Sequence, residues 1–138
     1  MKQAAVMLIV NPKGLILSVS RRYDTTKFGL PGGKVDRGEE PWQAAVRETM
    51  EETSIITRDP KLIFERVEPP VTPDGLPFYT YAYYATDWIG TPKNSEEGIV
   101  EWLTVADLIG ERGAFPEYNK LTFNAFKKLY PNIKLLGE

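Results

Sequence analysis

Three glutamates share one face of a predicted helix and could together hold a metal ion. Residues 41–53 read as a helix, and Pro41 suits its first position. At about 100° per residue, Glu48, Glu51 and Glu52 fall within about 100° of one another. The apolar side chains predicted to face the core lie nearly opposite: Trp42, Val46 and Met50. Carboxylates at this spacing repel one another. Two interpretations remain open: a solvated acidic face, and a divalent-cation site in which the metal cancels this repulsion.

A glycine-rich segment just before this helix favours the metal interpretation. Leu30, Pro31, Gly32 and Gly33 read as an apolar approach into a turn, and glycine lets the backbone come close to a metal or ligand. Clustered carboxylates behind such a loop form an oxygen-lined site, which suits Mg²⁺ or Mn²⁺ and leaves ligand positions for phosphates. The chain contains no His and no Cys. This excludes Ser-His-Asp triads, histidine or thiolate metal sites and Cys nucleophiles.

The spacing of these residues resembles the Nudix box. Its characteristic positions are occupied by Gly33, Glu39, Arg47, Glu48, Glu51, Glu52 and Ile55. Without Ile55, these are six fixed identities, and at background frequencies near 7% they give a chance match about once in 10⁷ windows. Two positions depart from the pattern: Thr49 stands where an aliphatic residue is usual, and Ser54 stands where Gly is usual. If the helix end needs a left-handed residue, Ser costs about 1 kcal/mol more than Gly.

The resemblance implies an α/β fold, more narrowly α+β, in which a mixed β-sheet is sandwiched between helices. It also implies Mg²⁺-dependent hydrolysis of a nucleoside diphosphate linked to another group, with Mn²⁺ as an alternative cofactor. The ligands that it implies for the metal are Glu48, Glu51, Glu52 and the carbonyl of Gly32. The residues that it implies as their supports are Gly33, Glu39 and Arg47.

A carboxylate must take the proton of the attacking water, because the chain has neither His nor Cys. Glu48 and Glu52 are candidates within the box. Glu97 is a candidate outside it, because residues 96–103 resemble the Nudix loop and strand that carry an extra carboxylate. A solvated loop glutamate is the alternative interpretation of Glu97. Together with Arg47, these three glutamates form the predicted catalytic set.

Two further segments indicate a nucleotide substrate. The resemblance is closest to MutT-type nucleoside triphosphate pyrophosphohydrolases, which have arginines before the Pro-Gly-Gly segment and an Asn that reads the purine edge. Arg21 and Arg22 occupy the first place and could clamp a phosphate. Asn119 occupies the second place. An Asn suits the reading of a purine edge because its amide both donates and accepts hydrogen bonds. Phe28 and Tyr118 could stack on the base. The alternatives are a plain basic loop, a helix N-cap at Asn119 and core packing of Phe28.

The predicted reaction is hydrolysis of a (d)NTP, for example an oxidised purine nucleotide such as 8-oxo-dGTP, to a monophosphate and pyrophosphate. An ADP-sugar or dinucleoside polyphosphate hydrolase is the alternative, with Pro69 and Pro70 as a weak indication of ADP-ribose hydrolysis. A nucleotide sensor that does not cleave is a further alternative, although such modules commonly lose box glutamates that are present here. RNA 5′-end processing would require a path for a polyanion.

The remaining sequence predicts the elements around this site. The predicted strands are residues 3–10 and 15–20, paired through a turn at 12–14, and residues 55–57, 62–67, 78–88 and 99–103. Residues 21–27 and the proline-rich residues 68–77 read as loops. A short helix is predicted at residues 105–109, capped by Thr104, and a longer one over residues 121–130.

Length and composition fit one globular domain spanning residues 1–138. Hydrophobic residues make up 42% of the chain, which is enough for a sizeable core. The net charge of −2 disfavours a nucleic-acid partner. The longest apolar run, residues 4–10, is too short to cross a membrane. We therefore expect a cytoplasmic monomer or homodimer that binds a nucleotide.

Overall fold

The computed structural model describes residues 1–68 and 77–138 and contains a mixed central sheet. The strand order in this sheet is β4 (Gly32–Lys34), β1 (Lys2–Leu8), β7 (Phe78–Tyr84) and β6 (Lys61–Glu68). β1 runs parallel to β7 and antiparallel to β4. A second sheet has the order β3 (Asp24–Gly29), β2 (Ile16–Arg21) and β9 (Val100–Leu103), and β5 (Ile56–Arg58) pairs with β8 (Asp87–Ile89).

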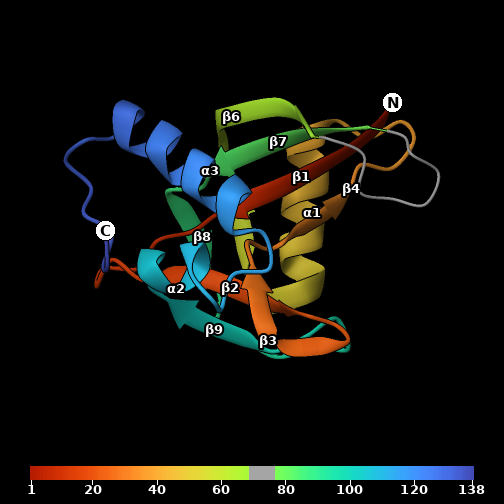
Figure 1. Cartoon of the computed structure of the whole chain (residues 1–138). Helices are drawn as coiled ribbons and strands as arrows, with labels where there is room; N and C mark the ends of the chain where they lie inside the picture. Colours follow the sequence, from red (N-terminus) through yellow and green to blue (C-terminus); the bar gives the residue numbers. More distant parts are fainter. Residues whose placement is uncertain (69–76) are drawn as a thin grey trace.

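Helices cover both faces of the central sheet (Figure 1). α1 (Pro41–Thr53) packs on β1, β4 and β7, whereas α3 (Pro116–Leu129) packs on β6 and on α2 (Val105–Ile109). Alternate residues of β1 enter separate cores, because successive side chains of a strand point to opposite faces. Ala5 and Met7 join the core that includes α1 residues, and Leu8 joins the core that includes α3 residues. The predicted mixed sheet between helices is confirmed.

Several predicted strand boundaries and pairings are wrong. Residues 3–10 and 15–20 pair across the predicted turn only at their near ends, through an antiparallel bridge between Val10 and Ile16. The rest of β1 pairs with β4 and β7, and β2 pairs with β3 and β9. The predicted loop at residues 21–27 contains the first four residues of β3, whose sequence is polar because most of these side chains are exposed. Residues 78–88 are divided between β7 and β8 of different sheets. Gly32 and Gly33 lie in β4 and not in a turn.

The buried side of α1 also differs from the prediction. Trp42 and Met50 are 45% and 47% exposed, while the buried residues are small: Ala44, Ala45, Thr49 and Thr53. Small side chains let the helix approach the sheet closely. The helix is therefore turned so that the side bearing Glu48 and Glu52, and not its most apolar side, meets β1 and β4.

The C-terminal end of α1 has a residue in the left-handed backbone conformation, as the usual Gly of the box pattern indicates. Ser54 is the C-cap with φ 67°, and its backbone N–H donates to the Met50 carbonyl at 2.9 Å. We expect Ser54→Gly to raise the free energy of unfolding by about 1 kcal/mol, because glycine adopts this conformation without a Cβ penalty. Thermal unfolding measures the gain, and Ser54→Ala serves as the control that should show none. Equal unfolding temperatures for all three proteins would contradict this account.

The C-terminal elements follow the prediction. Thr104 caps α2, with its Oγ1 accepting a hydrogen bond from the Asp107 N–H at 3.0 Å. α3 covers nearly all of the predicted last helix. In the described ranges, no helix is long and apolar enough to cross a membrane. The predicted loop at 68–77, with Pro69 and Pro70, falls largely on residues 69–76, which lie outside the described residues.

Candidate active site

Glu52 is the most enclosed carboxylate of the box. Its Oε1 accepts a hydrogen bond from the backbone N–H of Gly32 at 2.7 Å, which joins α1 to β4. The pKa of Glu52 is raised to about 8, mainly by burial and also by the negative charges of Glu48, Glu97 and Glu51, against the lowering effect of the Gly32 hydrogen bond. A buried carboxylate among like charges is a place where a cation would be strongly stabilising.

Arg47 connects the remaining carboxylates of the box. Its Nε donates to Glu39 at 2.8 Å, its Nη1 to Glu48 at 2.9 Å and to Glu51 at 3.3 Å, and its Nη2 to the Lys34 carbonyl at 3.1 Å. This contact with Arg47 lowers the pKa of Glu39, and the same hydrogen bond raises the pKa of Arg47 above its usual range. The guanidinium therefore fixes the loop after β4 to the acidic side of α1.

Removing Arg47 should affect both stability and activity. Arg47→Ala would leave Glu39 and Glu48 half-buried without their cation, so we expect the free energy of unfolding to fall by about 2 kcal/mol. Loss of the support around the acidic cluster should also lower kcat/KM about 10- to 100-fold. Denaturant unfolding and steady-state kinetics measure the two effects. Arg58→Ala, which removes an exposed cation in β5, is the control, and equal effects of both substitutions would contradict this role.

Both glycines of β4 are required by close contacts. A Cβ at Gly33 would lie 2.6 Å from the carboxyl carbon of Glu48, and a Cβ at Gly32 would lie 2.6 Å from the Val6 Cα. Any larger residue would displace either the carboxylate or strand β1. The conformational freedom of these glycines is thus less important here than the absence of a side chain.

The structure brings Glu97 to the box from a distant part of the sequence. Its charge is among the causes that raise the pKa of both Glu48 and Glu52. The adjoining loop is attached to β2, because the Ile99 N–H donates to Ser20 Oγ at 2.9 Å and a Cβ at Gly98 would lie 2.5 Å from the Ser20 carbonyl oxygen. Glu97 itself is exposed and so remains accessible to solvent and to a bound substrate.

The donor chemistry of this cluster suits a hard divalent cation. Its carboxylates supply oxygen ligands of the kind that Mg²⁺ and Mn²⁺ prefer. Among residues 1–68 and 77–138, no three acidic side chains already converge on one metal position. Arg47 and the Gly32 amide instead hold the carboxylates of Glu48, Glu51 and Glu52. A cation that binds here would therefore have to compete with these hydrogen bonds.

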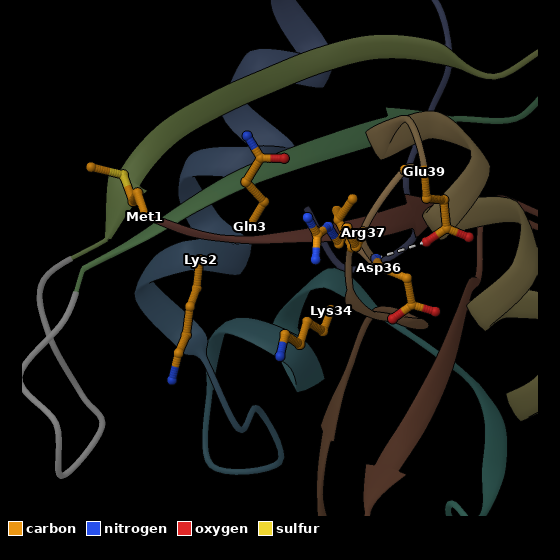
Figure 2. Close-up of a pocket in the computed structure, with 9 residues that line it drawn as sticks. Met1, Lys2, Gln3, Lys34, Asp36, Arg37 and Glu39 are labelled. Atoms are coloured by element: carbon orange, nitrogen blue, oxygen red, sulfur yellow. Dashed lines mark hydrogen bonds between the residues drawn. The ribbon is translucent and has the colours of Figure 1, made fainter.

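A polar cavity of about 460 Å³ adjoins the box and was missed from the sequence. Figure 2 shows Lys2, Lys34 and Arg37 among its lining residues. The acids on its lining are engaged elsewhere: Glu39 binds Arg47 and accepts from the Asp36 N–H at 3.0 Å, and Asp36 lies 3.4 Å from Arg47. Cations and acids thus share the lining of this cavity, and the position of Lys34 directly after Gly33 was the available signal.

The predicted substrate-binding residues are in three different environments. Arg21 and Arg22 are exposed, with the Arg21 guanidinium 5.0 Å from the Phe115 ring centroid. Phe28 is only 2% exposed and belongs to the core, which corresponds to its alternative interpretation. Tyr118 packs against Phe64, with 5.9 Å between ring centroids. Of these side chains, the arginines are the most accessible to a ligand.

Asn119 lies inside α3 and is not its N-cap, because Phe115 occupies that position. Its side chain is 1% exposed, and its Nδ2 donates to the Leu108 carbonyl at 2.9 Å. The amide therefore links α3 to α2 and has one donor committed in the protein. The N-cap interpretation is wrong, and the base-reading interpretation stays a prediction.

Comparison with known proteins decides the family. The model of the NUDIX domain matches residues 1–125. The chain belongs to the Nudix family. The Nudix protein is 31% identical over 130 residues to the 8-oxo-dGTP diphosphatase of Escherichia coli K12, which covers 92% of this chain and 97% of that relative. It is 33% identical over 123 residues to the 8-oxo-dGTP diphosphatase of Haemophilus influenzae Rd, with 85% of each protein covered.

Solved structures agree on the fold. The crystal structure of a MutT NUDIX hydrolase from Burkholderia pseudomallei superimposes with a TM-score of 0.73 at 23% identity, covering 90% of this chain and 96% of that one. This likeness confirms the fold. The family match and the two relatives confirm the enzyme class predicted from the box, a Nudix pyrophosphohydrolase.

Proposed function

We propose that this Nudix enzyme hydrolyses a nucleoside triphosphate to a monophosphate and pyrophosphate in a Mg²⁺-dependent reaction. The observation that carries the proposal is the position of two box carboxylates against β4: Glu52 Oε1 accepts the Gly32 N–H at 2.7 Å, and the Glu48 carboxylate lies against Gly33. Both diphosphatase relatives, matched over most of their length, support the triphosphate as the substrate class.

The residues proposed to hold the cation are Glu48, Glu51, Glu52 and the carbonyl of Gly32. Mn²⁺ would fit the same oxygen ligands. When bound, the cation would neutralise phosphate oxygens, orient a water and stabilise the leaving group. Arg47 and Glu39 would position the ligands, and Lys34 and Arg37 lie where they could contact a phosphate.

Glu97 is well placed to take part in the proton transfer. We expect Glu97→Gln to lower kcat/KM about 10- to 100-fold, because the side chain keeps its shape but loses the charge that acts on the box. Glu96→Gln is the matched control, since Glu96 is an exposed neighbour in the same loop. It should stay within about two-fold of the wild type. If the two variants behave alike, Glu97 is only a solvated loop residue.

An oxidised purine triphosphate such as 8-oxo-dGTP is our more specific proposal for the substrate. It rests on the two relatives and on the position of Asn119 near the start of α3. Because the Asn119 amide also links α3 to α2, Asn119→Ala could lower activity on every substrate. The measurement is therefore the ratio of kcat/KM for oxidised dGTP to kcat/KM for ordinary dGTP, in the variant and in the wild type. An unchanged ratio would remove Asn119 from base recognition.

The reaction is tested with Mg²⁺ on ordinary and oxidised (d)NTPs, ADP-ribose and dinucleoside polyphosphates, with products separated by ion exchange. A monophosphate and pyrophosphate from one triphosphate would support the proposal and identify the base. Turnover of ADP-ribose or a dinucleoside polyphosphate alone would support the proposed hydrolysis but refute the triphosphate as its substrate. Tight binding without any turnover would indicate a sensor and refute the enzymatic proposal.

A further inference from the structure

The segment before β9, which carries Glu97, is held in place mainly by side-chain oxygens. Four consecutive backbone N–H groups, those of residues 97–100, all donate to oxygens of the protein. The Gly98 N–H donates to the Ser95 carbonyl at 3.3 Å, and the other three donate to side chains. Connecting segments are usually the more mobile parts of a domain. Here the backbone around Glu97 is fixed, although Glu97 itself is exposed.

Ser95 closes the turn from which Glu97 projects. The Ser95 N–H donates to the Gly98 carbonyl at 3.1 Å, and the two residues form an antiparallel bridge. The Ser95 Oγ accepts the Glu97 N–H at 3.0 Å. Serine hydroxyls stabilise turns through such hydrogen bonds to the backbone two residues on. Glu96 and Glu97 are thus the two central residues of a closed turn.

Ser20 of β2 joins this turn to the second sheet. Its N–H donates to the Ile99 carbonyl at 2.9 Å, and its Oγ accepts the Ile99 N–H at 2.9 Å. In a regular antiparallel ladder, the Ile99 N–H would donate to the backbone carbonyl of the facing residue. The hydroxyl of Ser20 accepts it here, one step beyond the last β2–β9 pair, Val19 and Val100. An alanine at this position would leave the Ile99 N–H without that partner.

The turn lies directly against Ser20. A Cβ on Gly98 would be 2.5 Å from the Ser20 carbonyl oxygen and 2.8 Å from its Oγ. The place of Glu97 therefore depends on a residue of β2 that is itself only 5% exposed. From this place the charge of Glu97 acts on Glu48 and Glu52. A group that takes part in a reaction must be held to within about 0.5 Å of its productive position, which a free loop does not achieve.

We propose that Ser20 and Ser95 are positioning residues, which hold the turn so that the Glu97 carboxylate is directed to the proposed reaction. The proposal rests on the proposed function and on the role of Glu97 in it. Neither hydroxyl has to touch the substrate or the cation. Their loss should therefore lower kcat through Glu97 and change KM little.

The test is a double-mutant cycle between Ser20 and Glu97, with hydrolysis of 8-oxo-dGTP in Mg²⁺ as the readout. Ser20→Ala should lower kcat about ten-fold and leave KM within about two-fold, because a misplaced reacting group slows the reaction itself. In the Glu97→Gln background, the same substitution should lower kcat by less than about two-fold. A residue that acts through Glu97 has nothing left to position once that carboxylate is gone.

Ser18→Ala is the matched control for this cycle. Ser18 is also buried in β2, but its Oγ donates within its own strand, to the Ile16 carbonyl at 3.0 Å. The control should keep kcat within about two-fold of the wild type, and denaturant unfolding compares the stability of the two variants. Losses that multiply in the Ser20→Ala/Glu97→Gln double variant, or an equal loss in Ser18→Ala, overturn the role of Ser20.

Ser95 provides a second test that does not disturb a buried position. Its side chain is exposed, so substitution there leaves the core intact. Ser95→Ala should lower kcat about three- to ten-fold. Ser95→Thr keeps an accepting hydroxyl and should stay within about two-fold of the wild type. Equal kcat values for these three proteins overturn the role of Ser95.

Amide hydrogen exchange separates this inference from the proposed function, because it is measured without metal or substrate. Exchange of the Ile99 N–H should be at least about ten-fold faster in Ser20→Ala, and that of the Glu97 N–H in Ser95→Ala, with no change in Ser18→Ala. If exchange is unchanged while Glu97→Gln is impaired, the inference alone fails. If exchange responds but Glu97→Gln keeps the wild-type kcat, the proposed role of Glu97 fails and the inference fails with it.

Discussion

Replacing Glu52 by glutamine is expected to lower kcat at least about a hundred-fold, the largest loss predicted for a single substitution in this protein. Glutamine keeps the shape of the side chain, and its amide oxygen can still accept the Gly32 N–H that Glu52 accepts at 2.7 Å. The substitution removes the innermost negative charge of the cluster and, under the proposed function, a ligand of the cation. Steady-state hydrolysis over a range of Mg²⁺ concentrations measures the effect.

A stability measurement separates this loss of activity from a loss of folding. In the absence of metal, Glu52→Gln should unfold at a higher temperature than the wild type at pH 8, because a buried charge that repels Glu48 and Glu97 has been removed. Glu117→Gln, an exposed carboxylate in the first turn of α3, should change neither property. Retention of more than about a tenth of the wild-type kcat in Glu52→Gln would refute the proposed role.

The acidic cluster of the box could be predicted because its geometry is local. Glu48, Glu51 and Glu52 lie within five residues on one helix, so the helical period alone places them on one side. Their link to Gly32 and Gly33 could be anticipated only in outline, since the contact depends on β4 pairing with β1. Glu97 was identified by resemblance, and its approach to the box depends on contacts with Ser20 that span almost eighty residues of sequence.

The errors share a physical cause, which is that pairing and packing between distant segments are not encoded in local pattern. A continuous apolar run identified β1 as a strand, yet its partner β7 begins some seventy residues later. The most apolar side of α1 suggested that Trp42 and Met50 are buried, whereas the helix instead directs Glu48 and Glu52 toward β4. A site that must collect carboxylates next to the sheet overrides the usual burial of the apolar side.

The metal-free protein is expected to lose stability as the pH rises from about 5 to about 8. The pKa of Glu52 is raised from its ordinary value to about 8 in the folded protein, mainly by burial, so the folded state binds this proton more tightly than the unfolded chain. At acid pH both states hold the proton and no penalty exists. Between these pH values only the unfolded chain is ionised, which favours unfolding, and above about pH 8 the penalty is constant. The raised pKa of Glu48, also caused by burial, acts in the same direction.

Thermal unfolding across this pH range, with and without Mg²⁺, tests the argument. Glu39 has a lowered pKa because it binds Arg47, so its contribution is lost only at acid pH and falls outside the window. Glu52→Gln should remove most of the fall in unfolding temperature between pH 5 and pH 8. Mg²⁺ should restore stability most strongly at pH 8, because a cation that binds only the folded protein stabilises it by mass action and prefers ionised carboxylates. If the wild type and Glu52→Gln lose stability in parallel, and Mg²⁺ stabilises both equally, then Glu52 neither carries the buried charge nor contributes to holding the cation.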